Sequence, residues 1–387
     1  MHRASLTTVL REWGRIGCVG FGGPPTHIAL LRKLCVDERR WLTAQEFEDA
    51  IAACNLLPGP ASTQLAIFCA WRVRGRPGAL VGGAAFILPG LIAILALSAL
   101  FLGNPPTWVV AAGAGAGAAV AAVAAQAGTA LMPPGWKRAA VQSSRRRWAA
   151  YLLLGAAAAA TVGPWLVLLL IACGVIEVLA QRPRDASPAP RAGRPPHSLT
   201  LLAATGLGGG VLLSLAWVAL KVGALSYGGG FVIIPLMQAD AVDHYHWMTD
   251  AEFLNAVALG QITPGPVVHT VAVVGYAAAG LTGGLLAAAV AFGPSFAFIL
   301  LGAHRFDQLR ANPRVRAFLD GAAPAAIGAI LGSTVPLIRA LTEPWQYAVL
   351  AGAAVLTLLL RRGPVLTLLA AATAGVVIVL AGGSLPH

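Results

Sequence analysis

Two stretches of similar sequence decide the fold of this chain. Residues 21–60 read FGGPPTHIALLRKLCVDERRWLTAQEFEDAIAACNLLPGP, and residues 227–266 read YGGGFVIIPLMQADAVDHYHWMTDAEFLNAVALGQITPGP. They align without a gap, 206 residues apart, and share a Gly-Gly pair, a tryptophan, a Thr-x-x-Glu-Phe pattern and a closing Pro-Gly-Pro. Chance similarity between apolar segments would not keep a tryptophan and a Pro-Gly-Pro in register over this length, so the chain contains an internal repeat.

The composition places both copies in a membrane. Of the 387 residues, 57% are hydrophobic and only 11% are charged, against about 25% charged in an ordinary soluble domain. A net charge of +12 would suit nucleic acid in a soluble protein. Here, however, the basic residues lie between long apolar runs, as they do in the loops of membrane proteins. We therefore expect an integral membrane protein surrounded by a lipid bilayer, with no nucleic-acid partner.

Apolar runs long enough to cross a bilayer, which takes about 20 helical residues, recur along the chain. They fall at 78–102, 108–131, 148–180, 199–226, 285–303, 318–339, 345–360 and 364–382. The run at 148–180 contains Pro164 and is long enough for two short helices. We predict an all-α polytopic membrane protein with a first membrane repeat at 1–180 and a second at 199–387. Residues 181–198, rich in Pro and Arg, form the predicted cytoplasmic linker.

Charge distinguishes the two copies. Between its Gly-Gly and Pro-Gly-Pro motifs the first copy carries four basic residues, Arg32, Lys33, Arg39 and Arg40. The corresponding residues 238–252 contain no Lys or Arg, and a further basic loop expected at 72–76 has no charged counterpart. Because cytoplasmic loops are rich in Lys and Arg, the same loop is predicted to face the cytoplasm in the first copy and the outside in the second. This is the inverted-topology repeat of many secondary transporters.

The Pro-Gly-Pro motifs predict broken helices. Basic loops flank residues 47–71 on what should be one side of the membrane, so this segment is predicted to be re-entrant, with two half-helices meeting at the motif. Residues 253–277 should do the same from the opposite face. Proline lacks an N–H and interrupts a helix, and irregular backbone is tolerated at membrane depth only where it faces protein or water. A Pro-kinked helix that spans the membrane is the alternative.

Two such breaks would bring two helix N-termini toward the middle of the membrane. A helix N-terminus offers free N–H groups and about half a positive charge, which together favour an anion. The candidate substrate-binding residues around the breaks are Gly22, Gly23, Pro58, Gly59, Pro60, Ser62, Thr63, Gln64, Gly228, Gly229, Pro264, Gly265, Pro266, His269 and Thr270. For the serine and threonines, capping of their own helices is the alternative role.

Arg15 and Lys221 are further candidates for binding an anion. They occupy equivalent positions of the repeat, six residues before Phe21 and Tyr227, in segments that otherwise resemble membrane helix. A cation at mid-bilayer costs about 2.5–3.5 kcal/mol or more, so its presence suggests a function. The alternative for Arg15 is an ion pair with Glu12, or a side chain that extends to the membrane surface.

No motif predicts catalysis, a metal or a cofactor. The five cysteines form no Cys-x-x-Cys pair, and no metal-binding histidine spacing or nucleophile motif occurs within a predicted span. We therefore expect a protein that is not an enzyme and that binds no metal and no cofactor. A phosphate-binding ATPase motif is also missing from the sequence, so ion gradients or the membrane potential should drive any transport.

Taken together, the motifs of the two copies resemble those of a known family. FGGPPTHIALLRKLCVDERRWL, NLLPGPASTQLA and RGRPGALVGGAAFILPG, with the second copies YGGGFVIIPLM and GQITPGPVVHTVAVVGY, resemble the chromate ion transporter family in its long, two-domain form. The resemblance implies efflux of chromate across the inner membrane of a bacterium by a multi-pass protein, giving chromate resistance, with sulfate as the structural analogue. The second copy departs from the first at Gly230 and at Val267-Val268-His269, which makes the first half the better candidate for the main site if binding is asymmetric.

The direction of transport can be argued from charge. A dianion that leaves a cell gains about 4.6 kcal/mol per 100 mV, since each charge contributes about 2.3. Export can therefore be driven by the membrane potential or by a proton gradient, whereas import needs accompanying cations. The alternatives are proton-coupled uptake of sulfate or another oxyanion, a passive channel, and a lipid-facing scaffold that transports nothing. A homodimer is compatible with all of these.

Overall fold

The computed structural model describes residues 4–54, 59–103, 105–141, 144–161, 166–181, 210–226, 233–302 and 312–385, and within these ranges every regular element is a helix. The first repeat contains α1 (Leu6–Val19), α2 (Pro24–Arg32), the π-helical turn η1 (Lys33–Glu38), α3 (Ala44–Cys54), α4 (Ala61–Phe101), α5 (Thr107–Val141), α6 (Arg145–Thr161) and α7 (Leu166–Ala180). The predicted all-α class is confirmed.

The second repeat contains α8 (Val211–Leu225), α9 (Ile233–Gln238), the π-helical turn η3 (Ala239–His244), α10 (Asp250–Ile262), the short 3₁₀ turn η4 (Val267–His269) and α11 (Thr270–Gly302). It continues with α13 (Pro313–Gly332), α14 (Thr334–Arg339), α15 (Pro344–Ala354), the π-helical turn η6 (Val355–Leu359) and α16 (Pro364–Leu380). The order of elements from α8 to α11 repeats that from α1 to α4.

Matching parts of the two repeats have the same local geometry. The residue before each repeat tryptophan has a positive φ, 51° at Arg40 and 53° at His246. The backbone N–H of each of these tryptophans donates to the backbone carbonyl six residues earlier, at 2.8 Å. Both copies then begin the next helix with a threonine and a glutamate that bond each other's backbone N–H groups, a capping box. The shared Thr-x-x-Glu sequence therefore has the same physical role in each copy.

The long helices α4 and α11 are bent at equivalent glycines. Gly75 has φ of 67° and Gly280 has φ of 61°, a region that glycine adopts without steric cost. The basic segment 72–76, predicted to be a loop, is this bend in α4, with its three arginines exposed. The predicted spans 78–102 and 285–303 correspond to the parts of α4 and α11 that follow the bends.

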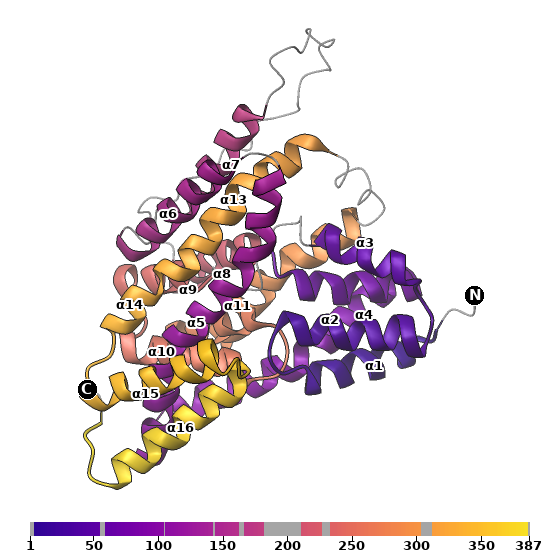
Figure 1. Ribbon diagram of the computed structural model, residues 1–387. Coiled ribbons are helices and arrows are strands. Elements are labelled where there is room, and N and C mark those ends of the chain that lie inside the picture. Colours follow the sequence, from indigo (N-terminus) through magenta and orange to yellow (C-terminus); the bar gives the residue numbers. More distant parts are fainter. Residues whose placement is uncertain are drawn as a thin grey trace.

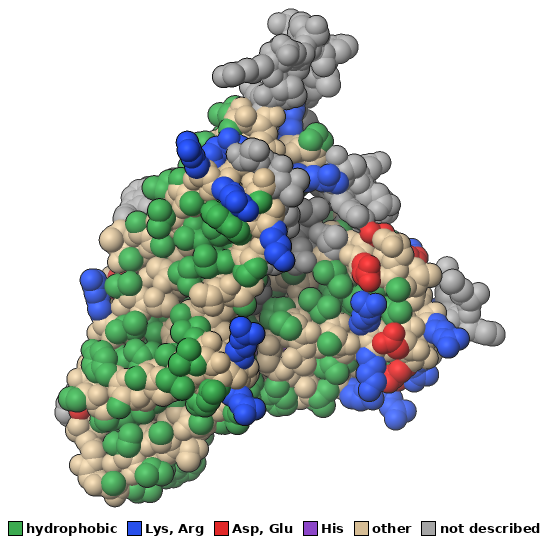
Figure 2. Space-filling model, viewed as in Figure 1, with side chains coloured by type: hydrophobic (Ala, Val, Ile, Leu, Met, Phe, Trp, Pro, Cys, Tyr) green, Lys and Arg blue, Asp and Glu red, His purple; other side chains and the backbone are tan. Residues whose placement is uncertain are grey.

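Four of the described helical segments are long and apolar enough to cross a membrane: Ala61–Phe101, Thr107–Lys137, Val267–Gly302 and Pro313–Arg339. Shorter apolar segments occupy Leu166–Ala180, Val211–Leu225, Pro344–Leu359 and Pro364–Leu380. The predicted run at 148–180 is two helices, α6 and α7, although Pro164 lies outside the described residues. Large apolar side chains on these helices face outward, among them Leu359 and Leu380, which are 74% and 77% exposed. Figure 2 shows such side chains covering α6, α13, α15 and α16, while charged residues gather over α1 to α3.

The two halves interlock (Figure 1). Helix α5 of the first half packs against α15 and α16 of the second, and α13 of the second half packs against α6 and α7 of the first. Small residues allow this close approach: a Cβ on Gly115 would lie 2.2 Å from the Ala371 carbonyl, and one on Gly328 would lie 1.9 Å from that of Leu152. The helices α4 and α11 contact each other at the centre. The division at the linker remains a prediction, since residues 182–209 lie outside the described ranges.

Candidate functional site

Both Pro-Gly-Pro motifs separate two helices, as the sequence predicts. Helix α3 ends at Cys54 and α4 begins at Ala61, while α10 ends at Ile262 and η4 begins at Val267. The central glycines have positive φ, 115° at Gly59 and 92° at Gly265. Pro60 and Pro266 then stand at the N-caps of the following helices. Pro58 lies outside the described residues, and the re-entrant course of these segments, like the inverted topology, remains a prediction.

Each Pro-Gly-Pro turn lies against the long helix of the other repeat. A Cβ on Gly59 would lie 3.5 Å from Ser295 Oγ in α11, and also 2.6 Å from the side-chain nitrogen of Gln64. A Cβ on Gly90 in α4 would lie 2.1 Å from the Pro264 carbonyl oxygen. Gly90 and Ser295 each follow a proline of the long helix. The two turns therefore meet the two long helices in a reciprocal arrangement at the centre of the molecule.

Several buried polar atoms near these turns make no hydrogen bond among the described residues. They are Thr63 Oγ1, Ser226 Oγ, Gln261 Nε2, both ring nitrogens of His269, and Ser295 Oγ. A neutral imidazole always carries one N–H donor, and leaving a buried donor unmet costs about 1–3 kcal/mol. His269, which is 0% exposed, lies with its ring against Gly90 and Gly265, and the nearby Ile87 backbone makes no hydrogen bond of full geometry with it. A ligand that accepts hydrogen bonds would satisfy this cluster.

His27 connects this cluster to the first helix and was not among the candidates from the sequence. Its Nδ1 lies 3.2 Å from Ser62 Oγ and its Nε2 lies 2.9 Å from the Gly20 carbonyl oxygen. The same carbonyl accepts the Gly265 N–H at 3.0 Å. His27 thereby joins the end of α1 and the start of α4 to the Pro-Gly-Pro turn of the second repeat. In the sequence the only signal was a single histidine close to the Gly-Gly motif.

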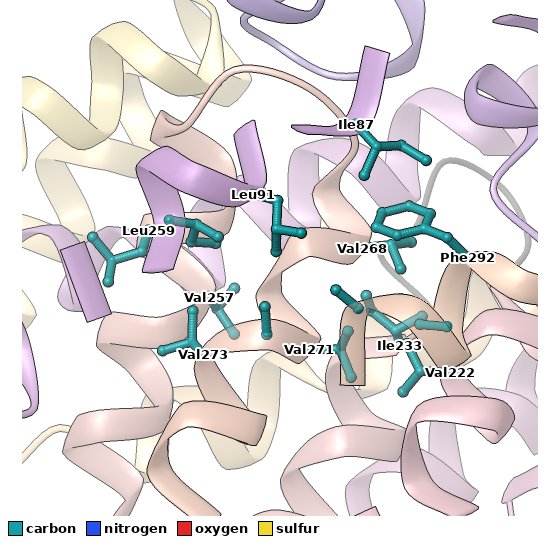
Figure 3. Close-up of a cluster of buried hydrophobic side chains, with 14 of the residues drawn as sticks. Ile87, Leu91, Val222, Ile233, Val257, Leu259, Val268, Val271, Val273 and Phe292 are labelled. Carbon is teal, nitrogen blue, oxygen red and sulfur yellow. The ribbon is translucent and has the colours of Figure 1, made fainter. Parts of the chain in front are cut away.

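Apolar side chains enclose these polar groups. The His27 ring packs edge-on against Phe86 at 5.0 Å, and the His269 ring packs in the same way against Phe292 at 5.2 Å. Figure 3 shows Phe292 beside Ile87 and Val268, where α4, α11 and η4 meet. Phe292, Ile87 and Val268 are all buried. The site is therefore closed to solvent, and its polar groups interact in an environment of low dielectric.

The remaining candidates near the turns differ in their partners. Ser62 bonds His27, whereas the Thr270 hydroxyl donates to the Val267 carbonyl at 2.8 Å, the local role that the sequence left open. Gly22 and Gly23 have positive φ, and a Cβ on Gly23 would lie 3.7 Å from Val267, so this turn also reaches the second repeat. Gly228 and Gly229 lie outside the described residues.

Arg15 and Lys221 both have carboxylate partners. Arg15 lies 3.4 Å from Glu12, and its side chain is 59% exposed. Lys221 Nζ lies 2.6 Å from Asp240, and these side chains are only 18% and 8% exposed. An anion bound at either cation would have to compete with Glu12 or Asp240.

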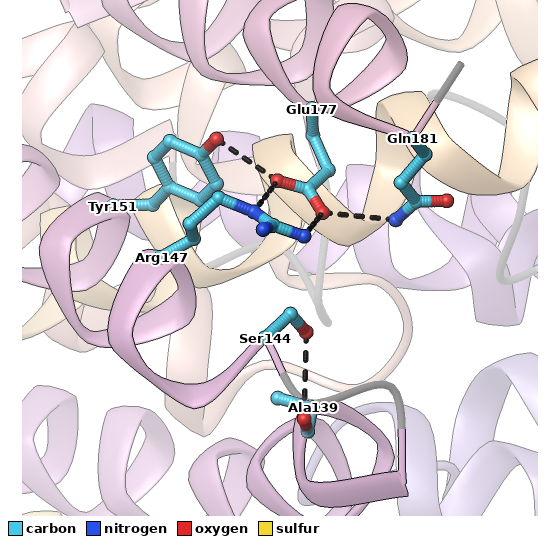
Figure 4. Close-up of polar contacts among 6 residues, drawn as sticks. All are labelled: Ala139, Ser144, Arg147, Tyr151, Glu177 and Gln181. Atoms are coloured by element: carbon cyan, nitrogen blue, oxygen red, sulfur yellow. Dashed lines mark hydrogen bonds and ion pairs between the residues drawn. The ribbon is translucent and has the colours of Figure 1, made fainter. Parts of the chain in front are cut away.

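A second buried carboxylate is fully satisfied and links α6 to α7 (Figure 4). Glu177, 2% exposed, accepts two hydrogen bonds from Arg147 and one each from Tyr151 and Gln181, all at 2.9 Å. A buried charge is stable only when paired and hydrogen-bonded, so this network has a structural role. Among the described residues no cluster of histidine, cysteine or acidic side chains could hold a metal ion. The five cysteines are free, and only Cys18 is exposed.

Comparison with known proteins gives one family. A family model described as "Chromate transporter" matches residues 7–178 and 213–376. The chromate transport protein of Cupriavidus metallidurans is 32% identical over 346 residues, which cover 87% of this chain and 83% of the relative. That of Pseudomonas aeruginosa is 30% identical over 343 residues, covering 85% and 80%. An uncharacterised transporter of Methanocaldococcus jannaschii is 27% identical over 348 residues, covering 86% and 85%.

No solved structure matches the chain. The family model covers both repeats, and with the apolar helices of the structure it makes this a multi-pass membrane protein. The chain belongs to the chromate transporter family.

Proposed function

We propose that this protein exports chromate from the bacterial cytoplasm across the inner membrane, giving chromate resistance, and that the anion binds between the two Pro-Gly-Pro turns. The observation that carries the proposal is His269, a fully buried histidine whose ring nitrogens make no hydrogen bond of full geometry among the described residues, with only the Ile87 backbone nearby as a partner. It is the last residue of η4, directly before α11, and its ring lies against Gly90 of α4. Two relatives, those of Cupriavidus metallidurans and Pseudomonas aeruginosa, are named chromate transport proteins, which supports chromate as the substrate.

The electrostatics of this region favour an anion. Two helix N-termini each contribute about half a positive charge, and Ser62, Thr63, Ser295 and His269 add hydroxyl or ring donors. Burial strengthens these interactions, because water does not screen them. A tetrahedral dianion has oxygen acceptors in every direction and can use donors from both repeats at once. Such a closed site must open to each side in turn, and the glycine bends at Gly75 and Gly280 are suitable hinges.

Export of a dianion needs no other ion, since it moves toward the positive side of the membrane and gains about 4.6 kcal/mol per 100 mV. Proton-coupled uptake of sulfate or another oxyanion is the second candidate function. The observation that favours it is the pair of buried histidines, His27 and His269, because histidine is the side chain that most readily binds a proton near neutral pH.

Transport by inside-out vesicles tests the proposal. With an interior-positive potential, vesicles that contain the protein should accumulate chromate, and accumulation should rise with the potential. His269→Ala should weaken chromate binding about fivefold or more, as expected for the loss of one hydrogen bond of about 1 kcal/mol. His244→Ala, at an exposed residue at the end of η3, is the matched control and should behave like the unaltered protein. Chromate accumulation that is independent of both potential and protein would refute export.

A further inference from the structure

The hydrogen bonds of His27 fix which ring nitrogen carries the proton. Gly20 offers only a carbonyl oxygen, which can accept but not donate, so Nε2 must donate across the 2.9 Å contact. In a neutral imidazole the other nitrogen then has no hydrogen. Nδ1 therefore accepts the hydroxyl hydrogen of Ser62 across the 3.2 Å contact. The carbonyl of Gly20 is also bonded to Gly265, which holds the acceptor in place.

This arrangement decides what Ser62 can offer to an anion. A serine hydroxyl has one hydrogen. While that hydrogen is donated to His27, Ser62 presents only lone pairs to a ligand, and lone pairs repel an anion. If His27 takes up a proton, its Nδ1–H donates to Ser62 Oγ, and the serine hydrogen becomes available to an anion. Ser62 lies in the first turn of α4, where the helix dipole favours negative charge.

The groups around His27 make that proton costly in the absence of an anion. Gly20, directly after α1, contributes its carbonyl, α4 contributes Ser62 and the Phe86 ring, and η4 contributes His269, the titratable neighbour. No carboxylate and no other charged side chain of the described residues acts on His27. A buried imidazolium without a counter-charge is unfavourable, and a dianion bound at the turns would supply that charge.

We infer that His27 binds a proton together with the oxyanion, so that the transporter carries one proton with each anion. The inference rests on the proposed function and adds to it a second substrate and the residue that binds it. For a dianion, the net charge moved in each cycle falls from two to one. Since the two bind cooperatively, each must raise the affinity for the other by the same factor.

The pH dependence of anion binding tests this inference. Chromate affinity of the purified full-length protein is measured at two alkaline pH values one unit apart, where chromate remains a dianion, with sulfate as a second probe. Uptake of one proton on binding predicts that Kd rises about tenfold for each unit of pH. His27→Gln can still donate to Gly20 and accept from Ser62 but cannot become charged, so its Kd should not change with pH. A pH-independent Kd for the unaltered protein would overturn the inference.

Two further variants locate the proton. His269→Gln should bind more weakly at both pH values but keep the tenfold dependence; loss of the dependence here and not in His27→Gln would overturn the assignment to His27. Ser62→Ala should weaken binding by the same factor at both pH values and keep the tenfold dependence, because the bound state carries the proton on His27 at both and the serine hydrogen then faces the anion. An unchanged affinity in Ser62→Ala would refute the switch. If the unaltered protein binds neither chromate nor sulfate at any pH, the proposed function itself fails, whereas binding without a pH dependence overturns only the proton.

Discussion

The two repeats join their first helix to the following turn with ion pairs of opposite polarity. In the first repeat the carboxylate is on α1, where Glu12 binds Arg39, which follows η1, at 2.6 Å. In the second repeat the cation is on α8, where Lys221 binds Asp240 in η3 at 2.6 Å. The residues at the equivalent positions differ, so the ion pairs are not inherited side chain by side chain. The two repeats therefore make the same connection with either polarity.

The exits from the Pro-Gly-Pro turns differ in a second way. The first continues as α-helix from Ala61, whereas the second begins with the 3₁₀ turn Val267–His269. The Pro-Gly-Pro motifs lie 206 residues apart but the glycine bends only 205, so the second copy is one residue shorter between them. A 3₁₀ turn rises more per residue than an α-helix, and it brings a histidine to the place where the first repeat has Thr63. The backbone symmetry is therefore kept while the chemistry of the two sides differs.

Removing one carboxylate from each ion pair should give the largest contrast between the repeats. Asp240→Ala leaves Lys221 largely buried without a partner, which typically costs about 3–5 kcal/mol. Glu12→Ala leaves Arg15 and Arg39, whose side chains are 59% and 47% exposed, so its cost should be about 1 kcal/mol or less. Thermal unfolding of the purified protein in detergent measures both.

A charge reversal sharpens the same comparison. Lys221→Asp combined with Asp240→Lys gives the second repeat the polarity of the first, and the double variant should be more stable than either single variant. If the double variant is no more stable than the two singles, the second repeat does not accept the polarity of the first. If Asp240→Ala costs no more than Glu12→Ala, the burial of Lys221 does not set the difference between the two ion pairs.

A methyl group at the centre should have an intermediate effect. Gly90→Ala places a Cβ 2.1 Å from the Pro264 carbonyl, and because that backbone cannot move without moving the Pro-Gly-Pro turn, we expect a loss of about 2–3 kcal/mol. Gly75→Ala is the matched control: no atom of the described residues lies within 4 Å of its Cβ, and only its φ of 67° is unfavourable, at about 1 kcal/mol. The second repeat has Ser295 at the position of Gly90. If Gly90→Ala and Gly75→Ala are equally stable, the Pro-Gly-Pro turns are not packed reciprocally against the two long helices.

The sequence predicted those features that depend on local pattern. The repeat, the helix breaks at Pro-Gly-Pro and the two helices within 148–180 follow from motif register, proline and apolar length. The partner of Lys221 could not be predicted, because Asp240 reaches it only after the chain turns back through η3. His27 was missed for a similar reason, since its role depends on Gly20, Ser62 and Gly265 meeting in space. The exchange of α5 and α13 between the halves is likewise long-range and leaves no periodic signal.

The smallest predicted effect contrasts two loop carboxylates, one in each repeat. Backbone and hydroxyl hydrogen bonds from Thr43, with the Arg72 guanidinium nearby, hold the pKa of Glu46 below its ordinary value. Burial and the neighbouring Asp250 raise the pKa of Asp243. Glu46 therefore adds stability at neutral pH that is lost as the pH falls through its lowered pKa, so Glu46→Gln should destabilise the protein at neutral pH but not in acid.

The contribution of Asp243 to stability has the opposite sign, because its charged form is disfavoured in the fold. Asp243→Asn should raise the unfolding temperature at neutral pH, and that gain should vanish in acid. Unfolding temperatures across this pH range measure both, and changes of the same sign in the two variants would contradict the assignment.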